Sequence, residues 1–362
     1  MNDSIKKYFL YLMSDDPAVR GPVPDILKLL LYWLSFVYGM ALAIAKAGAK
    51  PYRPRGCKVI SVGNITLGGT GKTPLVAAIA KRFKRDGKRA VILTRGYMAD
   101  AKTGIADEPE FYRRTLAGVP VITGRDRAAS AKEAEAKYSP SLLLLDDGFQ
   151  HWGIARDLDI VTVDLNNPFG NGSLLPRGIL REPVSSLKRA GMVVITKVLP
   201  DMSSLGKAEA LKSRIRTENP GAQVFNASYC ARRLHDVSGG YDTPIDAINC
   251  KQVALLCAIG DPRSFEDTVV STGAIVAAQY YFIDHHIFTA AEIGRIMKEC
   301  KDKGIDTVVT TEKDLPRIKN SGAALVSPET AGVRILALSV ELVIDKEEQF
   351  FGGLDSLFTR KA

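Results

Sequence analysis

The chain has 362 residues, which at roughly 150 residues per domain corresponds to about two domains. Hydrophobic residues make up 46% and charged residues 25%, and these values exclude a disordered or collagen-like chain. Because the sequence has a single long apolar run, a polytopic membrane protein is excluded as well. The net charge of +9 suits anionic partners, such as phosphorylated substrates, acidic lipid headgroups or nucleic acids. Aromatic residues are only 7% and are not interleaved with basic clusters, so we expect no nucleic-acid partner.

An apolar run without a charge lies near the N-terminus, where residues 29–45 read LLLYWLSFVYGMALAIA. Its length is at the lower limit of a membrane-spanning helix. Interfacial aromatics lie in the run and four cations follow it: Tyr32, Trp33, Tyr38, Lys46, Lys50, Arg53 and Arg55. We predict that residues 1–50 form a membrane-associated helical segment, which either spans the bilayer or lies at its surface. A buried core helix and a cleaved signal peptide remain as alternatives.

Beyond this run, short apolar strands alternate with helices. The expected elements of a first domain, residues 51–220, are strands at 58–62, 90–93, 142–145, 160–163 and 192–195, and helices at 74–85 and 130–138. Such an alternation predicts an α/β fold with a mostly parallel sheet that helices cover on both faces.

The alternation restarts after the charged stretch 201–220, which predicts a second, smaller α/β domain over residues 221–345. Its expected elements are strands at 252–259, 278–282, 307–310, 333–338 and 340–344, and helices at 264–272 and 290–301. Residues 346–362 are expected to be a C-terminal tail. The five cysteines, Cys57, Cys230, Cys250, Cys257 and Cys300, are odd in number and form no C-x-x-C pair. They therefore indicate a reducing compartment and no zinc site.

The first chemical motif follows the first strand, where residues 63–73 read GNITLGGTGKT and resemble the P-loop pattern G-x-x-x-x-G-K-[ST]. The glycines let backbone N–H groups approach phosphate oxygens, the lysine adds a positive charge, and the last threonine can bind Mg²⁺. The following helix points its N-terminus at the same phosphates. The predicted nucleotide-binding residues are Thr66, which replaces the first glycine of the pattern, and Gly68, Gly69, Thr70, Gly71, Lys72 and Thr73.

A second motif, LLLLDD over residues 142–147, has the form of a buried strand that delivers a carboxylate to the metal beside a P-loop. Adjacent side chains on an extended chain point to opposite faces, so Asp146 and Asp147 are expected to take different roles. The nucleotide is expected to be ATP, because the two GTPase signatures are imperfect. Leu145 stands where D-x-x-G needs its acid, and Leu199 stands where the acid of N/T-K-x-D would follow Thr196 and Lys197.

Further motifs occur in a set order along the chain: RGY at 95–97, DEP at 107–109, DDGFQH at 146–151, LREP at 180–183 and DHH at 284–286. With the P-loop, they resemble the tetraacyldisaccharide 4′-kinase family of lipid A biosynthesis, and the resemblance runs from the apolar helix to Asp314. It implies a P-loop NTPase-like sheet with a smaller domain that closes over the active site. It also implies transfer of the ATP γ-phosphate to the 4′-hydroxyl of a tetraacyldisaccharide 1-phosphate, with Mg²⁺, at the cytoplasmic face of the bacterial inner membrane. Met98 and Ala106 depart from the family pattern, which has glycine at both positions, and the loop between Tyr97 and Asp107 is short.

The resemblance also implies site residues. Asp107 would be the catalytic base, with His285, chosen over His286, as its partner across the domain cleft. Lys72 and Asp147 complete the predicted catalytic set, and the expected metal ligands are Thr73, Glu108, Asp146 and Asp147. The 1-phosphate and the sugars need cations and polar groups, and the candidates are Arg95, Tyr97, Arg127, His151 and Arg181. We also expect contact with a membrane surface of anionic lipids.

Two other kinds of function remain open at this point. The chain could be a membrane-associated P-loop ATPase that switches a protein partner, or a soluble small-molecule kinase with a buried N-terminal helix. ADP release with and without a lipid A precursor tests the first alternative, and flotation with liposomes tests the second.

Overall fold

The structure is a computed structural model that describes residues 12–13, 21–96, 107–284, 286–323 and 332–359. It divides into two compact units, one of residues 1–228 with 344–362 and the other of residues 229–343. The chain passes into the second unit inside strand β7 (Gln223–Asp236) and returns at the end of β12 (Arg334–Ile344). The sequence analysis placed the boundary before β7, at residue 220.

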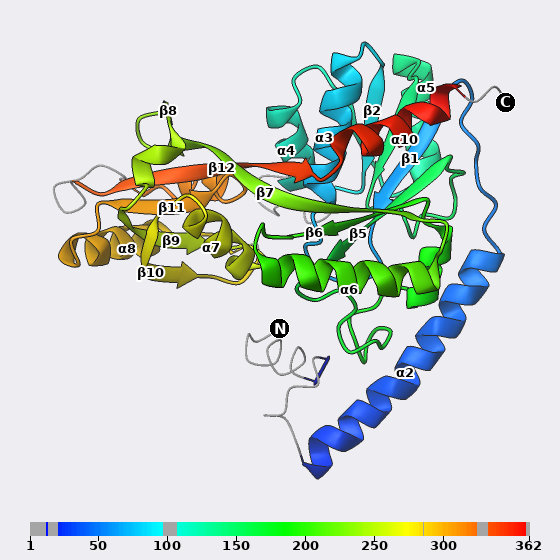
Figure 1. The fold of residues 1–362 in the computed structure, drawn as a ribbon, viewed down its shortest axis with the longest axis horizontal. Helices are drawn as coiled ribbons and strands as arrows, with labels where there is room; N and C mark the ends of the chain where they lie inside the picture. The colour runs from blue at the N-terminus through cyan, green and yellow to red at the C-terminus, as the bar shows by residue number, and fades with distance from the viewer. Residues whose placement is uncertain (1–11, 14–20, 97–106, 285, 324–331, 360–362) are drawn as a thin grey trace. The chain divides into compact units, whose positions relative to one another are not determined.

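The first unit is built on a parallel sheet with the strand order β3-β2-β4-β1-β5-β6-β7 (Figure 1). The strands are β1 (Lys58–Gly63), β2 (Ala90–Thr94), β3 (Val121–Thr123), β4 (Leu142–Asp146), β5 (Leu158–Asp164) and β6 (Met192–Thr196), followed by β7. The neighbouring strands of this sheet run parallel to one another. All residues of β2, β4 and β6 are buried, as expected for strands that are covered on both faces.

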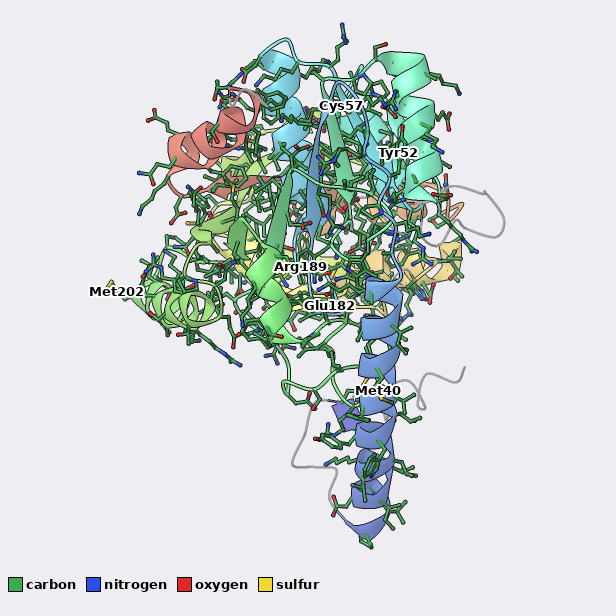
Figure 2. The ribbon with its side chains drawn as sticks, turned by 90° about the vertical axis from the view of Figure 1, so that its right-hand side faces the viewer. Met40, Tyr52, Cys57, Glu182, Arg189 and Met202 are labelled. Atoms are coloured by element: carbon green, nitrogen blue, oxygen red, sulfur yellow. The ribbon has the colours of Figure 1, made fainter. Side chains whose placement is uncertain are left out.

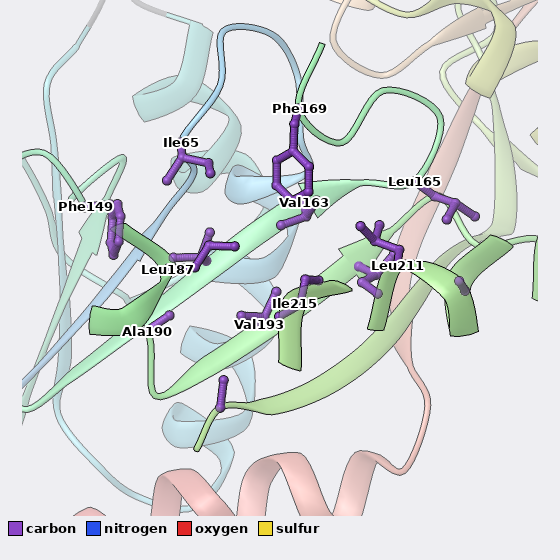
Figure 3. Packing of buried hydrophobic residues seen from close by; sticks show 14 of the residues in the cluster. Ile65, Phe149, Val163, Leu165, Phe169, Leu187, Ala190, Val193, Leu211 and Ile215 are labelled. Carbon is purple, nitrogen blue, oxygen red and sulfur yellow. The ribbon is translucent and has the colours of Figure 1, made fainter. Parts of the chain in front are cut away.

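Helices cover this sheet: α3 (Lys72–Arg85), α4 (Asp107–Thr115), α5 (Arg127–Tyr138), α6 (Met202–Glu218) and the short 3₁₀ helix η1 (Val184–Arg189). One apolar core lies between β5, β6, α6 and η1 and includes Phe149, Val193 and Ile215 (Figure 3). The charged stretch 201–220 of the sequence analysis is thus a helix, α6, whose buried residues belong to this core.

The segment 346–362, predicted as a tail, contains helix α10 (Glu347–Thr359), so that prediction was wrong. This helix belongs to the first unit and packs against α3, the helix that follows the P-loop. The rings of Phe83 and Phe358 lie 5.5 Å apart, and Asp355 pairs with Lys88 at 2.9 Å and with Arg82 at 3.7 Å. The C-terminal segment therefore supports the nucleotide-binding unit.

The second unit contains β7 and β12 with β9 (Gln252–Cys257), β10 (Ile275–Tyr281) and β11 (Thr307–Thr311), in the order β10-β9-β11-β12-β7. Strand β8 (Asp242–Thr243) pairs with β7. The remaining elements are α7 (Pro262–Val270), α8 (Ala290–Asp302), α9 (Leu315–Lys319) and the 3₁₀ helix η2 (Ile245–Ile248). The two strands predicted at 333–338 and 340–344 are one continuous strand, β12.

Helix α2 (Pro22–Ala47) contains the apolar run and is long and apolar enough to cross a membrane by length and composition. Leu31 and Ser35 are buried on one side of it, whereas most of its large apolar side chains are exposed. The exposed set is Val23, Ile26, Leu29, Leu30, Tyr32, Trp33, Leu34, Phe36, Val37, Met40 and Ile44; Figure 2 marks Met40 on the helix. A buried core helix would not expose most of its large apolar side chains, so the core-helix alternative does not fit α2.

Candidate active site

The carboxyl ends of two neighbouring strands bring the two main motifs together. Strands β1 and β4 pair in parallel, with Val62 beside Asp146. The P-loop that follows β1 and the acidic pair at the end of β4 therefore leave the sheet at the same edge. Gly63 makes this possible, because a Cβ atom on it would lie 2.5 Å from the Cβ of Phe149. The two turns are packed directly against each other.

The P-loop has an open outer side and a supported inner side. Gly68 and Gly71 have φ angles of 107° and 80°, and Gly71 is the residue before the first turn of α3. On the inner side, the hydroxyl groups of Thr70 and Thr162 lie 2.7 Å apart, and the Thr196 hydroxyl donates to the Thr70 carbonyl at 3.1 Å. Strands β5 and β6 thus hold the loop in a shape that leaves backbone N–H groups at a helix N-terminus for an anion.

A second segment pairs with the P-loop, and the sequence analysis did not find it. Residues 174–182, which we call the connector, meet the first part of the loop by a short antiparallel contact between Thr66 and Leu180. The Leu67 N–H donates to the Ile179 carbonyl and the Arg181 N–H donates to the Ile65 carbonyl, both at 2.7 Å. Arg181 therefore enters the site with its backbone fixed to the P-loop.

Asp147 lies between two cations. Its carboxylate is 3.5 Å from Lys72 Nζ and accepts from the Arg181 guanidinium at 2.9 Å. Burial alone would raise the pKa of Asp147, but Lys72 and Arg181 outweigh that cost and lower it to about 2. The residue has a φ of 53°, a left-handed conformation that aspartate tolerates better than most residues. The turn thus places a permanently charged carboxylate beside the P-loop lysine.

Asp146 is held differently, at the buried end of β4. The Tyr112 hydroxyl donates to its carboxylate at 2.8 Å, and the Arg127 guanidinium donates to its backbone carbonyl at 3.1 Å. Tyr112 belongs to α4, which begins at Asp107. At 1.5 Å per residue, the start of the helix lies about 7.5 Å from Tyr112 along the helix axis. Tyr112 was not among the predicted site residues, because a single tyrosine in a short helix carries no sequence signal.

Positive charge collects around His151. Burial lowers the pKa of His151 most, and Arg127, Arg95 and Arg181 lower it further, so that it reaches about 4 despite the nearby Asp147. Four of the five predicted substrate residues therefore lie within electrostatic reach of one another. The imidazole is neutral at pH 7, so it can offer hydrogen bonds without adding a charge.

A polar network behind the acidic turn was also missed. Glu182 is buried and accepts from Arg189 at 2.8 Å and from the Gln150 amide at 3.0 Å (Figure 2 labels Glu182 and Arg189). The same Gln150 amide donates to the Asn64 carbonyl at 2.8 Å, and the Asn64 side chain accepts from Arg181 at 3.3 Å. Gln150 and Glu182 stand inside the motifs DDGFQH and LREP, which was the available signal.

Known proteins of one kinase family are similar to this chain over most of its length. The family model for tetraacyldisaccharide-1-P 4′-kinase matches residues 27–359. The tetraacyldisaccharide 4′-kinase of Anaeromyxobacter dehalogenans (strain 2CP-C) is 38% identical over 308 residues, which cover 81% of each chain. That of Halothermothrix orenii is 31% identical over 94% of this chain and 96% of its own. The chain belongs to the tetraacyldisaccharide 4′-kinase family.

A solved structure confirms the fold of this kinase. LpxK from Aquifex aeolicus in complex with ATP superposes with a TM-score of 0.64 and 24% identity, covering 92% of this chain and 99% of that one. The predicted fold class, a P-loop-type parallel sheet with a further α/β part and one N-terminal apolar helix, is thereby confirmed. The ATPase-switch and small-molecule-kinase alternatives are not favoured for a member of this family.

Several predicted residues of the kinase lie outside the described part of the chain. These are Tyr97, Met98, Ala106 and His285, and the side chains of Asp107 and Glu108. The neighbouring His286 is described: its ring stacks on Phe282 at 4.5 Å, and its Nε2 lies 3.2 Å from Glu292, which caps α8. His286 thus has structural contacts of its own, and the preference for His285 stays a prediction.

The donor set suits the cofactors of this kinase, ATP and Mg²⁺. A hydroxyl on Thr73 and carboxylates on Asp146 and Asp147 are oxygen ligands of the kind that Mg²⁺ prefers. Within the described ranges, no three His, Cys, Asp or Glu side chains form a closed metal cluster. A P-loop metal does not need one, because it uses one or two protein ligands together with nucleotide phosphates and water.

Proposed function

We propose that this chain transfers the γ-phosphate of ATP to the 4′-hydroxyl of tetraacyldisaccharide 1-phosphate, producing the bis-phosphorylated lipid A precursor. The observation that carries the proposal is the joining of P-loop, acidic pair and Arg181 at one sheet edge, in a chain of this kinase family. In this reaction a bond forms between the 4′-oxygen and the γ-phosphorus. The bond from that phosphorus to the β–γ bridging oxygen breaks, and ADP leaves.

Lys72 and Arg181 supply positive charge where the transferred phosphoryl group needs it. In the structure both cations contact Asp147, whose low pKa keeps it a carboxylate. When phosphates fill the P-loop, the same cations can turn from Asp147 to phosphate oxygens without a change of protonation. Fixed charges of this kind stabilise the transition state because they need no reorganisation during the reaction. Thr73, Asp146 and Asp147 would hold Mg²⁺, which neutralises charge on the β- and γ-phosphates, and Glu108 is a further candidate ligand.

Asp107 is proposed to accept the proton of the 4′-hydroxyl, with His285 tuning or orienting it. Support comes from the family motif DEP and from the anchoring of α4 to Asp146 through Tyr112. Of the five predicted substrate residues, Arg95, Tyr97, His151 and Arg181 are proposed to contact the 1-phosphate and the sugars, and Arg127 is proposed to act on them through its charge. Arg127 is buried and donates to backbone carbonyls of Gly124 and Asp146, so we expect it to contribute mainly a long-range charge.

We further propose that the enzyme works on the cytoplasmic face of the inner membrane and contacts anionic lipids there. The exposed apolar side chains of α2 and the cations after it, Lys46, Lys50, Arg53 and Arg55, support this placement. An acceptor with four acyl chains costs about 0.8 kcal/mol per CH₂ group to move into water. An enzyme that binds at the bilayer surface avoids that cost.

The test is phosphate transfer from radiolabelled ATP to the disaccharide 1-phosphate in mixed micelles, with the full chain. We expect a labelled lipid with one additional phosphate, and no such product from Lys72→Ala. ATP hydrolysis without labelled lipid would contradict the proposed function. For the membrane proposal, flotation with vesicles that contain or lack anionic lipid is the measurement, and we expect stronger binding to the anionic vesicles.

A further inference from the structure

Helix α2 is apolar, yet polar groups attach it to the rest of the first unit. The buried Ser35 hydroxyl lies 2.8 Å from the Leu174 carbonyl and 2.9 Å from the Leu31 carbonyl, which share its one proton, and it accepts the Arg177 N–H at 3.0 Å. One turn later, the Tyr38 hydroxyl donates to the Arg181 carbonyl at 3.1 Å. The helix also approaches closely at Gly39, where a Cβ atom would lie 3.0 Å from Leu174. One side of α2, formed by Ser35, Tyr38 and Gly39, thus packs against one segment of the first unit.

That segment is the connector, residues 174–182, which also pairs with the P-loop. Its Arg181 N–H donates to Ile65, and its Leu180 forms the short antiparallel contact with Thr66. Within the connector, the Leu175 N–H donates to the Leu180 carbonyl at 2.8 Å. The surface helix is therefore linked to the phosphate-binding loop in two steps. Side chains of α2 bond to the connector backbone, and the connector backbone bonds to the P-loop.

Arg181 is the residue on which these contacts converge. Its carbonyl is held by Tyr38, its N–H by Ile65, and its guanidinium by Asp147 and Asn64. A backbone fixed at both its carbonyl and its N–H leaves a side chain fewer orientations. Burial raises the pKa of Tyr38 above its ordinary value, so its hydroxyl stays protonated and remains a donor.

We propose that Ser35 and Tyr38 are positioning residues, which dock α2 onto the connector and thereby fix Arg181 for phosphoryl transfer. The proposal rests on the proposed function for its meaning in catalysis. It assigns a second role to α2: the exposed apolar side faces the lipid, whereas the side of Ser35 and Tyr38 holds the active site in shape. The position of a helix that binds the lipid surface would then influence the position of the Arg181 guanidinium beside the P-loop.

The decisive variant is Tyr38→Phe, and Tyr138→Phe is its matched control. Each substitution removes one hydroxyl group from the first unit, but Tyr138 is exposed at the end of α5 and has no part in the proposed site or in the membrane contact. We expect Tyr38→Phe to lower kcat about 3- to 10-fold, the loss of one hydrogen bond, with little change in KM for ATP. Tyr138→Phe is expected to match the parent. Ser35→Ala should act in the same direction as Tyr38→Phe, because it leaves the Arg177 N–H without its acceptor.

A double-variant cycle with Arg181→Ala separates positioning from other roles of Tyr38. If Tyr38 acts through Arg181, Tyr38→Phe costs little when the guanidinium is already gone. Equal losses in both backgrounds, or no loss in Tyr38→Phe alone, would overturn the proposal.

Hydrogen exchange gives a readout that does not need activity. In Tyr38→Phe, amides of residues 174–182 should exchange about 3- to 10-fold faster, whereas Tyr138→Phe leaves them unchanged. Unchanged exchange in Tyr38→Phe would contradict the coupling. If the parent failed to phosphorylate the lipid, the proposed function would fall, and the exchange comparison would still decide whether α2 holds the connector.

Discussion

The nucleotide side and the acceptor side of this site are assembled in different ways. On the nucleotide side, neighbouring parallel strands bring together the P-loop and the acidic pair, and backbone hydrogen bonds add the connector. On the acceptor side, the proposed residues stand in the RGY motif after β2, at the start of α4 and in the DHH motif. The first arrangement is fixed by sheet register, whereas the residues proposed for the second side come from motifs far apart in the sequence. We therefore expect substitutions on the two sides to impair different steps. Those on the nucleotide side impair phosphate transfer from bound ATP, and those on the acceptor side impair use of the lipid.

The largest effect is expected on the acceptor side. Asp107→Ala should lower kcat by about 10²- to 10⁴-fold, the contribution of a general base, and leave ATP binding nearly intact. His285→Ala should do the same less severely, because it acts through the base. If the two work as a unit, the double variant is little worse than Asp107→Ala alone. The measurement is a double-mutant cycle on kcat at saturating ATP and lipid, and fully multiplicative losses would show that the two residues act independently.

On the nucleotide side, Lys72→Ala and Thr73→Ala should each lower kcat on the order of 10²- to 10³-fold, since each removes a contact to phosphate or metal. Lys81→Ala is a suitable control, because Lys81 is exposed on the same helix, α3. Steady-state rates at saturating ATP are the measurement. A Lys72→Ala enzyme with near-normal turnover would disprove the role assigned to the P-loop.

The two sides of α2 offer a sharper comparison within one helix. Trp33→Glu or Val37→Glu places a charge on the exposed apolar side, so vesicle binding should fall about tenfold or more per substitution. The KM for the lipid should rise, while kcat at saturating micellar substrate stays near the parent value. Deletion of residues 1–45 should also move the protein to the soluble fraction, but it removes Ser35 and Tyr38 as well and should lower kcat. Unchanged vesicle flotation of the Glu variants would refute the membrane role.

The local motifs of the site could be predicted, because each is contiguous and carries its own chemistry. Strand β4 was identified from four leucines before two acids, and β1 from the short β-rich run at 58–62. The link between α2, the connector and the P-loop could not be predicted in this way. It consists of hydrogen bonds to backbone groups between segments more than 100 residues apart in sequence. The donors come from two side chains of α2 and from the backbone, and a backbone partner leaves no residue pattern.

Helix α10 was missed for a different reason. Gly352 and Gly353 lower its intrinsic helix propensity, so the segment has the composition of a tail. The helix packs closely at Gly353, where a Cβ atom would lie 2.4 Å from the terminal methyl group of Met192. Burial of Phe350, Phe351 and Leu354 then stabilises a helix that is weak on its own. Tertiary contacts decided this element, and they are not visible in a local window of sequence.

The smallest expected effect is on the pH dependence of stability. It distinguishes the contribution of His151 from that of the nearby Asp147. A histidine whose folded pKa is about 4 binds its proton more tightly in the unfolded chain, where the ordinary value is 6.5. Protonation therefore favours unfolding, and stability falls as the pH drops from 6.5 toward 4. Asp147 has a pKa of about 2 in the folded chain and an ordinary value of 3.8. The stabilisation it contributes is therefore lost only as the pH falls from 3.8 toward 2, below the range of His151.

His151→Gln should thus flatten the stability profile between pH 6.5 and 4 by at most one proton, about 1.4 kcal/mol per pH unit, and by less because His151 is partly exposed. Below pH 3.8 the parent and the variant should lose stability in parallel, since both keep Asp147. Urea unfolding at pH 4.5 and 7 measures the difference. Equal slopes of stability against pH for parent and variant would show that His151 is not held neutral by burial and by its arginine neighbours. Its proposed role toward the substrate would then be that of a charged group and not of a neutral hydrogen-bonding one.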